Sequence, residues 1–336
     1  MKEALLYEKI KDGAVRCHLC SHRCRIRDKG FGFCGVRQNI EGILYTHAYG
    51  KAAAAHVDPI EKKPFYHFFP GSLSFSIATI GCNFRCEFCQ NWNISQASFM
   101  DGSSGPAIEE FTPQEIVEAA LKNKCRSISY TYTEPTIFFE YAMDTARLAK
   151  ERGLYNNFVT NGYMTRECIE MAGPWLSAAN IDLKFFRESS YKNICSASLK
   201  PVLEAIRLMR ESGIWVEITT LVVPGENDSE EELEGIARFI AGVDKNIPWH
   251  VSRFHPDYKA THNHPTPEAT LEKASAIGKK SGLKFVYAGN VYGWGNDTRC
   301  SDCGQLLIKR EMFSVSEYNM EKGRCPECNA KIPGVF

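Results

Sequence analysis

The sequence lacks several features that mark membrane, secreted or polyanion-binding proteins. Its 40 lysines and arginines balance 40 aspartates and glutamates, so no dominant nucleic-acid-binding face is expected, although a local basic patch is compatible with this balance. It has no apolar run of about 18 residues, which argues against a membrane-spanning helix. The charged stretch 1–9 has no signal-peptide core, so we expect a cytoplasmic protein. Internal repeats and low-complexity segments are also lacking.

Cysteine, by contrast, is abundant, with 14 in the chain. Most lie in three clusters whose members are only a few residues apart. Such spacing disfavours disulfides within a cluster and suits thiolates that converge on one metal. A disulfide-rich secreted protein is therefore not expected. The isolated Cys125, Cys168 and Cys195 are interpreted as small buried apolar residues.

The middle of the chain alternates short apolar segments with helical patterns. We expect strands at 73–80, 127–131, 155–160, 179–183, 215–223, 249–253 and 285–288. We expect helices at 112–121, 137–151, 165–172, 201–211, 229–240 and 267–280, the fifth with a Ser229–Glu232 capping box. This order predicts an α/β fold, either a barrel or a doubly wound parallel sheet. The expected domains are an N-terminal cysteine-rich module (1–64), a β/α barrel (65–292) and a C-terminal module (293–336).

The middle cysteine cluster lies directly after the first expected strand of this series. Cys82, Cys86 and Cys89 have the spacing C-x3-C-x2-C. Three thiolates can hold three irons of a cubane cluster and leave the fourth iron open. An open metal position is a reaction site, by the same logic that separates catalytic from structural zinc. A three-cysteine zinc site and a ferredoxin-like electron carrier are the alternatives.

This spacing resembles that of the radical S-adenosylmethionine (radical SAM) superfamily, and Phe88, before the last cysteine, fits the pattern. The resemblance implies a radical SAM partial (β/α)6 barrel, in which S-adenosylmethionine chelates the open iron of a [4Fe–4S] cluster. One electron, from a reductant such as ferredoxin or flavodoxin, breaks the sulfonium–C5′ bond, and the 5′-deoxyadenosyl radical takes a hydrogen atom from the substrate. The protein positions and shields this chemistry, with Phe88 near the adenine.

The resemblance also suggests cofactor contacts at the ends of the next strands. Glu134 would meet the methionine amino group, although Tyr132 and Thr133 stand where the superfamily commonly has glycines. A charge at a helix N-terminus is the other interpretation of Glu134. Asn161 ends the third strand of the series and is a further candidate cofactor contact.

Later strands add more candidates. Asp182 and Lys184 alternate on one strand face, where Lys184 would meet the methionine carboxylate. An ion pair at the strand end is the alternative. Glu217 and Thr219 share a face of the fifth strand. His255 follows the sixth strand and would lie over the adenosine, or else be structural.

The whole chain resembles one subfamily, the AmmeMemoRadiSam radical SAM enzymes, which are relatives of pyruvate formate-lyase activating enzymes. The resemblance rests on the segments 17–37, 58–64 and 130–136, and on the C-terminal cysteines that precede 332–334. It implies two partner protein families and indicates no substrate, which could be RNA, a protein or a metabolite. The Asp182-Leu183-Lys184 sequence also suggests a glycyl-radical-enzyme activase. A metal-binding or electron-transfer scaffold without its own chemistry is the third hypothesis.

The flanking cysteines form two further candidate metal sites. The C-terminal four, Cys300, Cys303, Cys325 and Cys328, have the spacing of a zinc ribbon, with rubredoxin-like iron and disulfides as the alternatives. The N-terminal four could hold zinc, which we favour, or a second iron–sulfur cluster, with His18 or His22 replacing one ligand; they are Cys17, Cys20, Cys24 and Cys34.

Basic residues near the N-terminal module suggest RNA as a candidate partner. Arg16, Arg23, Arg25, Arg27 and Lys29 surround its cysteines, and 62–69 interleaves bases with aromatics. A solvated basic face and core-packed rings are the favoured interpretation. Because a free radical must be kept from solvent, we expect the extensions to cover the barrel mouth.

Overall fold

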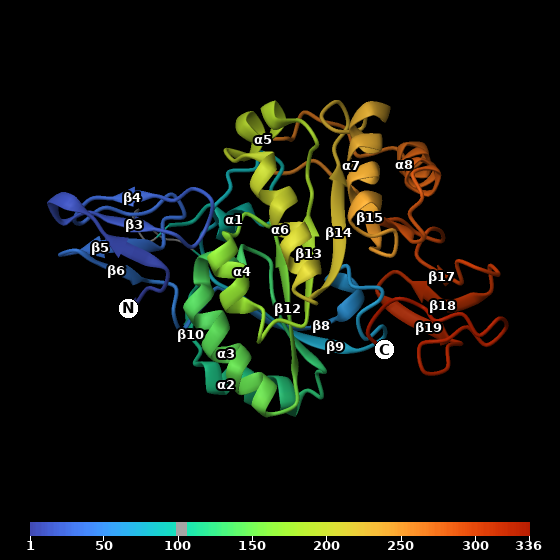
Figure 1. The fold of residues 1–336 in the computed structure, drawn as a ribbon, viewed down its shortest axis with the longest axis horizontal. Coiled ribbons are helices and arrows are strands. Elements are labelled where there is room, and N and C mark those ends of the chain that lie inside the picture. The colour runs from blue at the N-terminus through green and yellow to red at the C-terminus, as the bar shows by residue number, and fades with distance from the viewer. Residues whose placement is uncertain (99–105) are drawn as a thin grey trace.

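A computed structural model of the chain describes residues 1–98 and 106–336, and its centre is an open, strongly twisted eight-stranded sheet (Figure 1). The strand order is β16-β15-β14-β13-β12-β11-β9-β8. Seven strands are parallel, and they are β9 (Leu73–Ala78), β11 (Ser127–Tyr130), β12 (Tyr155–Thr160), β13 (Ala178–Asp182), β14 (Trp215–Val222), β15 (Trp249–Arg253) and β16 (Val286–Gly289). Each predicted strand is therefore present, and six β/α units precede the last strand.

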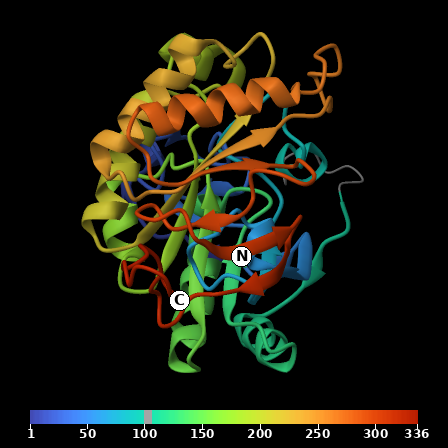
Figure 2. The ribbon, with the colours of Figure 1, turned by 90° about the vertical axis from the view of Figure 1, so that its right-hand side faces the viewer.

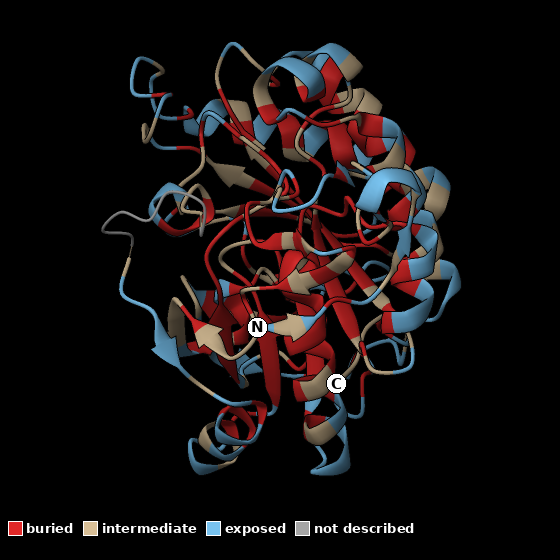
Figure 3. Cartoon of the chain, turned by 90° about the vertical axis from the view of Figure 1, so that its left-hand side faces the viewer, coloured by how far each residue is buried: buried red, intermediate tan, exposed pale blue. Residues whose placement is uncertain are grey.

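Helices pack on the outer face of this sheet, as predicted (Figure 3). They are α2 (Pro113–Lys122), η3 (Pro135–Phe138), α3 (Phe139–Glu151), α4 (Arg166–Ala172), α5 (Glu188–Cys195), α6 (Leu199–Glu211), α7 (Glu230–Val243) and α8 (Glu268–Lys280). The short α1 (Trp92–Ser95) follows the middle cysteines. None of the described helices is long and apolar enough to cross a membrane.

The capping box predicted at the start of α7 is only half formed. The Ser229 hydroxyl accepts the Glu232 backbone N–H, but the Glu232 carboxylate accepts the backbone N–H groups of Phe186 and Arg187 instead. A full capping box occurs at α2, where the Thr112 and Glu115 side chains each accept the other's backbone N–H. Glu232 thus ties α7 to the loop after β13.

The N-terminal region forms two small sheets beside the twisted central sheet, which with its helices makes up the partial barrel. One contains β2 (Tyr7–Lys9), β3 (Val15–Cys17) and β4 (Arg25–Ile26), and the other β1 (Lys2–Glu3), β6 (Ile43–Thr46) and β5 (Arg37–Ile40); η1 (Lys11–Gly13) links β2 and β3. β7 (Lys51–Ala52) pairs with β10 (Glu109–Glu110). β8 (Ala54–Pro59) lies antiparallel to β9, so residues 54–59 of the expected N-terminal module extend the central sheet.

The C-terminal module is a three-stranded antiparallel sheet on the opposite side of the barrel from the N-terminal sheets (Figures 1 and 2). Its strands are β17 (Thr298–Arg299), β18 (Leu306–Glu311) and β19 (Ser314–Tyr318). It packs on the connection from β8 to β9, which includes η2 (Ile60–Lys62). The fully buried Arg310 guanidinium lies 3.6 Å from the Glu61 carboxylate and donates to the Tyr66 carbonyl.

Candidate functional site

A cavity of about 420 Å³ lies among the carboxyl-terminal ends of the parallel strands. Small-molecule sites in proteins commonly have this size and position. The loops after successive strands line it, and the segment 61–66 closes one side. Met312 and Phe313, from the β18–β19 turn, complete the wall. Residues of both extensions therefore line the cavity, and whether they cover the barrel mouth stays a prediction.

Cys82, Cys86 and Cys89 line this cavity, on the loop between β9 and α1. Each sulfur has a polar neighbour. The Phe84 backbone N–H lies 3.3 Å from Cys82 Sγ, Cys195 Sγ lies 3.5 Å from Cys86 Sγ, and Ser95 Oγ lies 3.1 Å from Cys89 Sγ.

Burial raises the pKa of the Cys82 thiol, and contact with Cys195 together with burial raises that of Cys86. Three converging cysteines in a cavity with room beside them fit a cluster that leaves one iron open. Cys195 is buried as predicted, and it also touches this ligand set.

Glu134 is buried and lines the cavity. One carboxylate oxygen accepts the Thr136 backbone N–H and the Thr160 hydroxyl, and the other accepts the Asn161 backbone N–H at 2.8 Å. Burial raises the pKa of Glu134 despite these bonds. The carboxylate caps η3, and its second oxygen keeps room for another donor.

Asn161 connects this network to the cluster loop. Its side-chain amide donates to Asn83 Oδ1 at 2.7 Å and lies 3.9 Å from Cys82 Sγ. Asn161 lines the cavity and is buried. Asn161 thus reaches a cysteine of the candidate cluster, and a hydrogen bond to a metal ligand influences the properties of the metal site.

Asp182 and Lys184 both line the cavity and form the ion pair considered above, with Lys184 Nζ 2.9 Å from Asp182 Oδ2. Burial alone would lower the lysine pKa, but Asp182 and nearby thiolates hold it well above the usual value. The ammonium also lies 5.8 Å from the Phe88 ring centroid. An ammonium beside Phe88 is suited to bind a carboxylate.

Tyr132 has a backbone conformation that sequence reasoning left open. Its φ of 62° lies in the left-handed region, which costs a residue with a side chain roughly 1–2 kcal/mol. The phenol donates to Asp58, and Lys63 Nζ lies 3.9 Å from the ring centroid. Asn91 also donates to the Tyr132 carbonyl. A tyrosine with these contacts therefore occupies a backbone position that suits the glycine common in the superfamily.

Lys63 was missed as a cavity residue. Its side chain is only 2% exposed and pairs with Asp58 at 2.8 Å. Burial lowers the Lys63 pKa to about 8, although Asp58 opposes the shift. Asp58 and Lys63 both lie in the segment 58–64, which the family resemblance already singled out. Their contact with Tyr132 joins distant parts of the sequence, so local patterns could not reveal it.

The structure places Glu217 beneath the cavity instead of in its wall. Glu217 is fully buried and precedes Thr219, which lines the cavity, by two residues of β14. Two residues along a strand span roughly 7 Å, so Glu217 lies about that far below Thr219. At the level of Glu217 the segment 64–67 fills the barrel. The Glu217 carboxylate accepts the N–H groups of Tyr66 and His67 and faces His250 Nε2 at 2.7 Å.

His250, which sequence reasoning missed, lines the cavity above Glu217. It pairs in register with Thr219 on the neighbouring strand. His255 lies beyond the end of β15, is exposed and does not line the cavity; its ring is 2.9 Å from Gln90, which does. His255 therefore contacts a residue of the cavity wall, and its contact with the adenosine stays a prediction.

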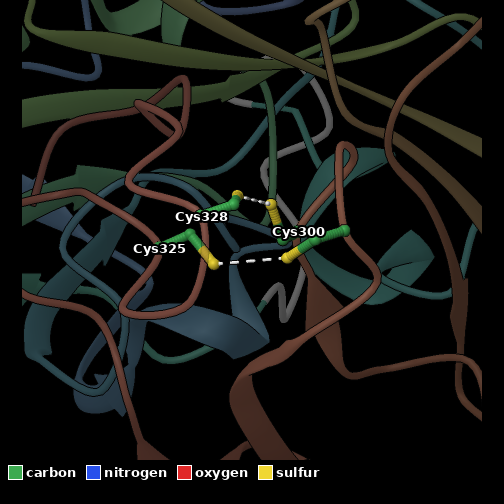
Figure 4. Close-up of side chains that lie close together, drawn as sticks. Cys300, Cys325 and Cys328 are labelled. Carbon is green, nitrogen blue, oxygen red and sulfur yellow. Dashed lines mark hydrogen bonds between the residues drawn. The ribbon is translucent and has the colours of Figure 1, made fainter.

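The C-terminal cysteines converge on one point (Figure 4). Their four sulfurs all lie within 4.8 Å of one another, and the pairs Cys300–Cys328 and Cys303–Cys325 are 3.6 Å apart. Zinc–sulfur bonds of about 2.3 Å place tetrahedral ligands about 3.8 Å apart. The four thiols therefore fit one tetrahedral metal ion.

The proposed aromatic stacking platform for RNA is contradicted. Phe65, Phe68 and Phe69 are buried, so their faces are covered by the protein core. Of the basic residues near the N-terminal cysteines, Arg23 pairs with Glu167 at 3.2 Å. These rings therefore pack in the core, as the favoured interpretation held.

Comparison with known proteins bears on the family and the fold. Residues 76–240 match the family described as "Radical SAM superfamily". An uncharacterized protein of Methanocaldococcus jannaschii is 46% identical over 340 residues, which cover 100% of both chains. Pyruvate formate-lyase 1-activating enzyme of Escherichia coli (strain K12) is 23% identical over 225 residues, 62% of this chain and 89% of that one.

A solved structure of a radical SAM methyltransferase from Sphaerobacter thermophilus has a TM-score of 0.52 at 19% identity, covering 71% of each chain. At this identity the likeness concerns the fold alone. The predicted radical SAM barrel and the resemblance to pyruvate formate-lyase activating enzymes are thereby confirmed.

Proposed function

The chain belongs to the radical SAM superfamily, an enzyme class that uses a [4Fe–4S] cluster and S-adenosylmethionine, and we propose that it abstracts a hydrogen atom from a substrate bound in the cavity described above. The observation that carries this proposal is that one cavity gathers the three cysteines, a buried carboxylate and the Lys184 side chain.

Each of these groups has a task in binding the cofactor. Cys82, Cys86 and Cys89 would hold the cluster, which supplies the electron that cleaves S-adenosylmethionine when both are bound. Lys184 offers its ammonium to the methionine carboxylate, and the free lone pair of Glu134 accepts from the methionine amino group. Phe88, buried beside this lysine, offers its ring to the adenine.

The cavity walls limit access of water to the reacting groups. Met312 and Phe313 close the wall on the C-terminal side, and the Lys63–Tyr132 pair closes it near the segment 61–66. Shielding of this kind prevents solvent from quenching a reactive species. The substrate, whether RNA, a protein or a metabolite, must place a C–H bond in the remaining space.

The direct test is product formation under anaerobic conditions. Protein with a loaded cluster, reduced with dithionite, should convert S-adenosylmethionine to 5′-deoxyadenosine, measured by mass spectrometry. Cys86→Ala should abolish the product, and Cys125→Ala, a buried cysteine outside the cavity lining, serves as the matched control. No product from a fully loaded protein, with or without cell extract as a source of substrate, would refute the proposal.

A second candidate, glycyl-radical activation, is favoured by the likeness to pyruvate formate-lyase activating enzyme and by Asp182-Leu183-Lys184. In that case the hydrogen donor is a backbone glycine of a partner protein. The electron paramagnetic resonance (EPR) doublet of a glycyl radical on an added partner would support this version. Its absence while 5′-deoxyadenosine still forms would exclude it.

The remaining assignments concern the surroundings of the enzyme. We assign the chain to the AmmeMemoRadiSam group, with its two partner protein families, on the sequence segments described above. A ferredoxin or flavodoxin would deliver the electron, as activating enzymes of this kind need a reductant. We propose structural zinc at Cys300, Cys303, Cys325 and Cys328, and a cytoplasmic location, whose reducing conditions suit free thiols.

A further inference from the structure

The N-terminal cysteines line a second, smaller pocket, separate from the cavity. Cys17 ends β3, Cys20 and Cys24 lie in the loop before β4, and Cys34 precedes β5; all four are free thiols. Apolar residues supply much of the remaining wall, namely Leu19, Ile26, Phe33 and Ile137. Four cysteines around one pocket indicate a metal-binding site with exclusively sulfur ligands.

The spacing of these sulfurs differs from that of the C-terminal site. In residues 1–98 and 106–336, the C-terminal four are the only group of three or more metal-ligating residues whose ligand atoms all lie within 4.8 Å of one another. No three of the N-terminal sulfurs meet that limit. A single tetrahedral zinc would hold its sulfurs about 3.8 Å apart.

A wider arrangement is expected when each thiolate binds a different iron of a cluster. The cavity cysteines provide an internal comparison, because Cys82, Cys86 and Cys89 also fail to form a group within 4.8 Å. The chain thus has one cysteine set spaced for a single ion and two sets spaced more widely.

Hydrogen-bond donors surround the N-terminal sulfurs. The Arg37 guanidinium donates to Cys17 Sγ at 3.3 Å, and the Phe33 backbone N–H donates to Cys24 Sγ at 3.5 Å. Arg37 is 1% exposed, and its Nε–H has no hydrogen-bond partner. The guanidinium also pairs with the buried Glu140 carboxylate, and hydrogen-bond donors to sulfur influence the reduction potential of an iron–sulfur cluster.

Histidine ligation is disfavoured at this site. His22 Nε2 lies 2.7 Å from the Asn83 carbonyl, and its ring packs on Phe33. His18 Nδ1 lies 2.7 Å from the Arg23 guanidinium, and its other nitrogen is 3.3 Å from Glu8. Neither histidine lines the pocket, so the ligand set is the four cysteines.

The pocket lies beside the loop of the radical SAM cysteines. Gly81, which directly precedes Cys82, packs closely against the backbone of Cys34: a Cβ added to Gly81 would lie 2.9 Å from the Cys34 carbonyl oxygen. The Arg85 guanidinium donates to the Phe33 carbonyl. The backbone of Cys20 forms an isolated antiparallel β-bridge with Met164, which follows β12. From these contacts and the sulfur spacing, we propose that Cys17, Cys20, Cys24 and Cys34 bind a second iron–sulfur cluster instead of zinc.

The test uses the full chain with the first cluster removed. A Cys82→Ala/Cys86→Ala/Cys89→Ala variant is reconstituted anaerobically with ferrous iron and sulfide, and iron, acid-labile sulfide and zinc are counted per chain. The proposal predicts iron and sulfide in equal amounts, about four of each for a cubane, with iron–sulfur Mössbauer signals.

Matched variants separate the two flanking sites. Adding Cys20→Ser/Cys24→Ser to the triple variant should remove the iron and leave the C-terminal metal, whose retention shows that the chain is folded. Adding Cys303→Ser/Cys328→Ser should instead leave the iron. A folded triple variant with zinc in both flanking sites and no sulfide, or with nothing bound by the N-terminal cysteines, would overturn the proposal, whatever the result for S-adenosylmethionine cleavage.

Discussion

Replacing Glu217 with glutamine should destabilise the barrel much more than it weakens cofactor binding. The Glu217 carboxylate is fully buried beneath the cavity. One oxygen accepts the N–H groups of His67 and Trp215, and the other accepts Tyr66 N–H and lies 2.7 Å from His250 Nε2. This charged acceptor therefore holds together the segment 64–67, β14 and β15.

The expected cost follows from the donors that lose an acceptor. With the glutamine NH₂ facing Tyr66 and His250, the imidazole can change tautomer and accept, but the Tyr66 backbone N–H cannot. A buried unpaired donor costs about 1–3 kcal/mol. The other bonds lose their charge-assisted character, which brings the total to roughly 2–5 kcal/mol. The opposite amide orientation is worse, since it leaves the N–H groups of His67 and Trp215 both unpaired.

The measurement is urea unfolding of the anaerobic, metal-loaded protein, followed by tryptophan fluorescence. The exposed Glu211→Gln is the control and should stay within about 0.5 kcal/mol of the parent. Affinity for S-adenosylmethionine should change little in Glu217→Gln, because Glu217 does not line the cavity. A stability loss below about 0.5 kcal/mol with a large loss of affinity would refute this reasoning and restore Glu217 as a cofactor ligand.

Three further predictions test other parts of the account. Lys184→Met removes a charged donor worth about 1.5–3 kcal/mol, so the dissociation constant for S-adenosylmethionine in equilibrium dialysis should rise roughly 10- to 100-fold. The control, Lys192→Met, changes an exposed lysine and should leave the constant unchanged. An unchanged constant in Lys184→Met would contradict the carboxylate contact. Burial lowers the His67 pKa from 6.5 to about 4. Between pH 6.5 and about pH 4, His67 is therefore protonated in the unfolded chain but not in the folded one. The free energy of unfolding should fall by roughly 3 kcal/mol as the pH drops through this window. If His67→Gln left the pH dependence of the unfolding free energy unchanged, this prediction would be refuted. Cys303→Ser/Cys328→Ser should release one metal ion and accelerate amide exchange throughout the C-terminal module, and unchanged exchange would show that the metal does not stabilise it.

The order of strands and helices could be predicted because it depends on local patterns. Short apolar segments, caps and turn residues lie within a few positions of each other, so the strand 155–160 was placed with both ends correct. The candidate ligand cysteines Cys82, Cys86 and Cys89 could be found for the same reason, since their spacing C-x3-C-x2-C is visible in the chain. Ser229 caps α7 as predicted, but the Glu232 half of the predicted capping box is not formed, because a distant loop takes the Glu232 carboxylate.

Depth within the barrel could not be predicted, because it depends on contacts between distant segments. Alternation assigned Glu217 and Thr219 to the same strand face, but only the packing of the segment 64–67 separates the buried floor from the cavity wall. The Lys63–Tyr132 contact likewise joins segments far apart in the sequence. A tyrosine where the superfamily commonly has glycine was the one local signal of that unusual backbone.

The cluster proposed at Cys82, Cys86 and Cys89 would keep an iron open to the cavity and bind S-adenosylmethionine there. The most direct measurement is the EPR spectrum of the dithionite-reduced protein, recorded with and without S-adenosylmethionine; the spectrum of the variant with all three cysteines replaced by alanine is subtracted to remove other signals. A cluster with an open iron should give a signal that changes when S-adenosylmethionine is added. A signal from a fully loaded site that saturating S-adenosylmethionine leaves unchanged would contradict it.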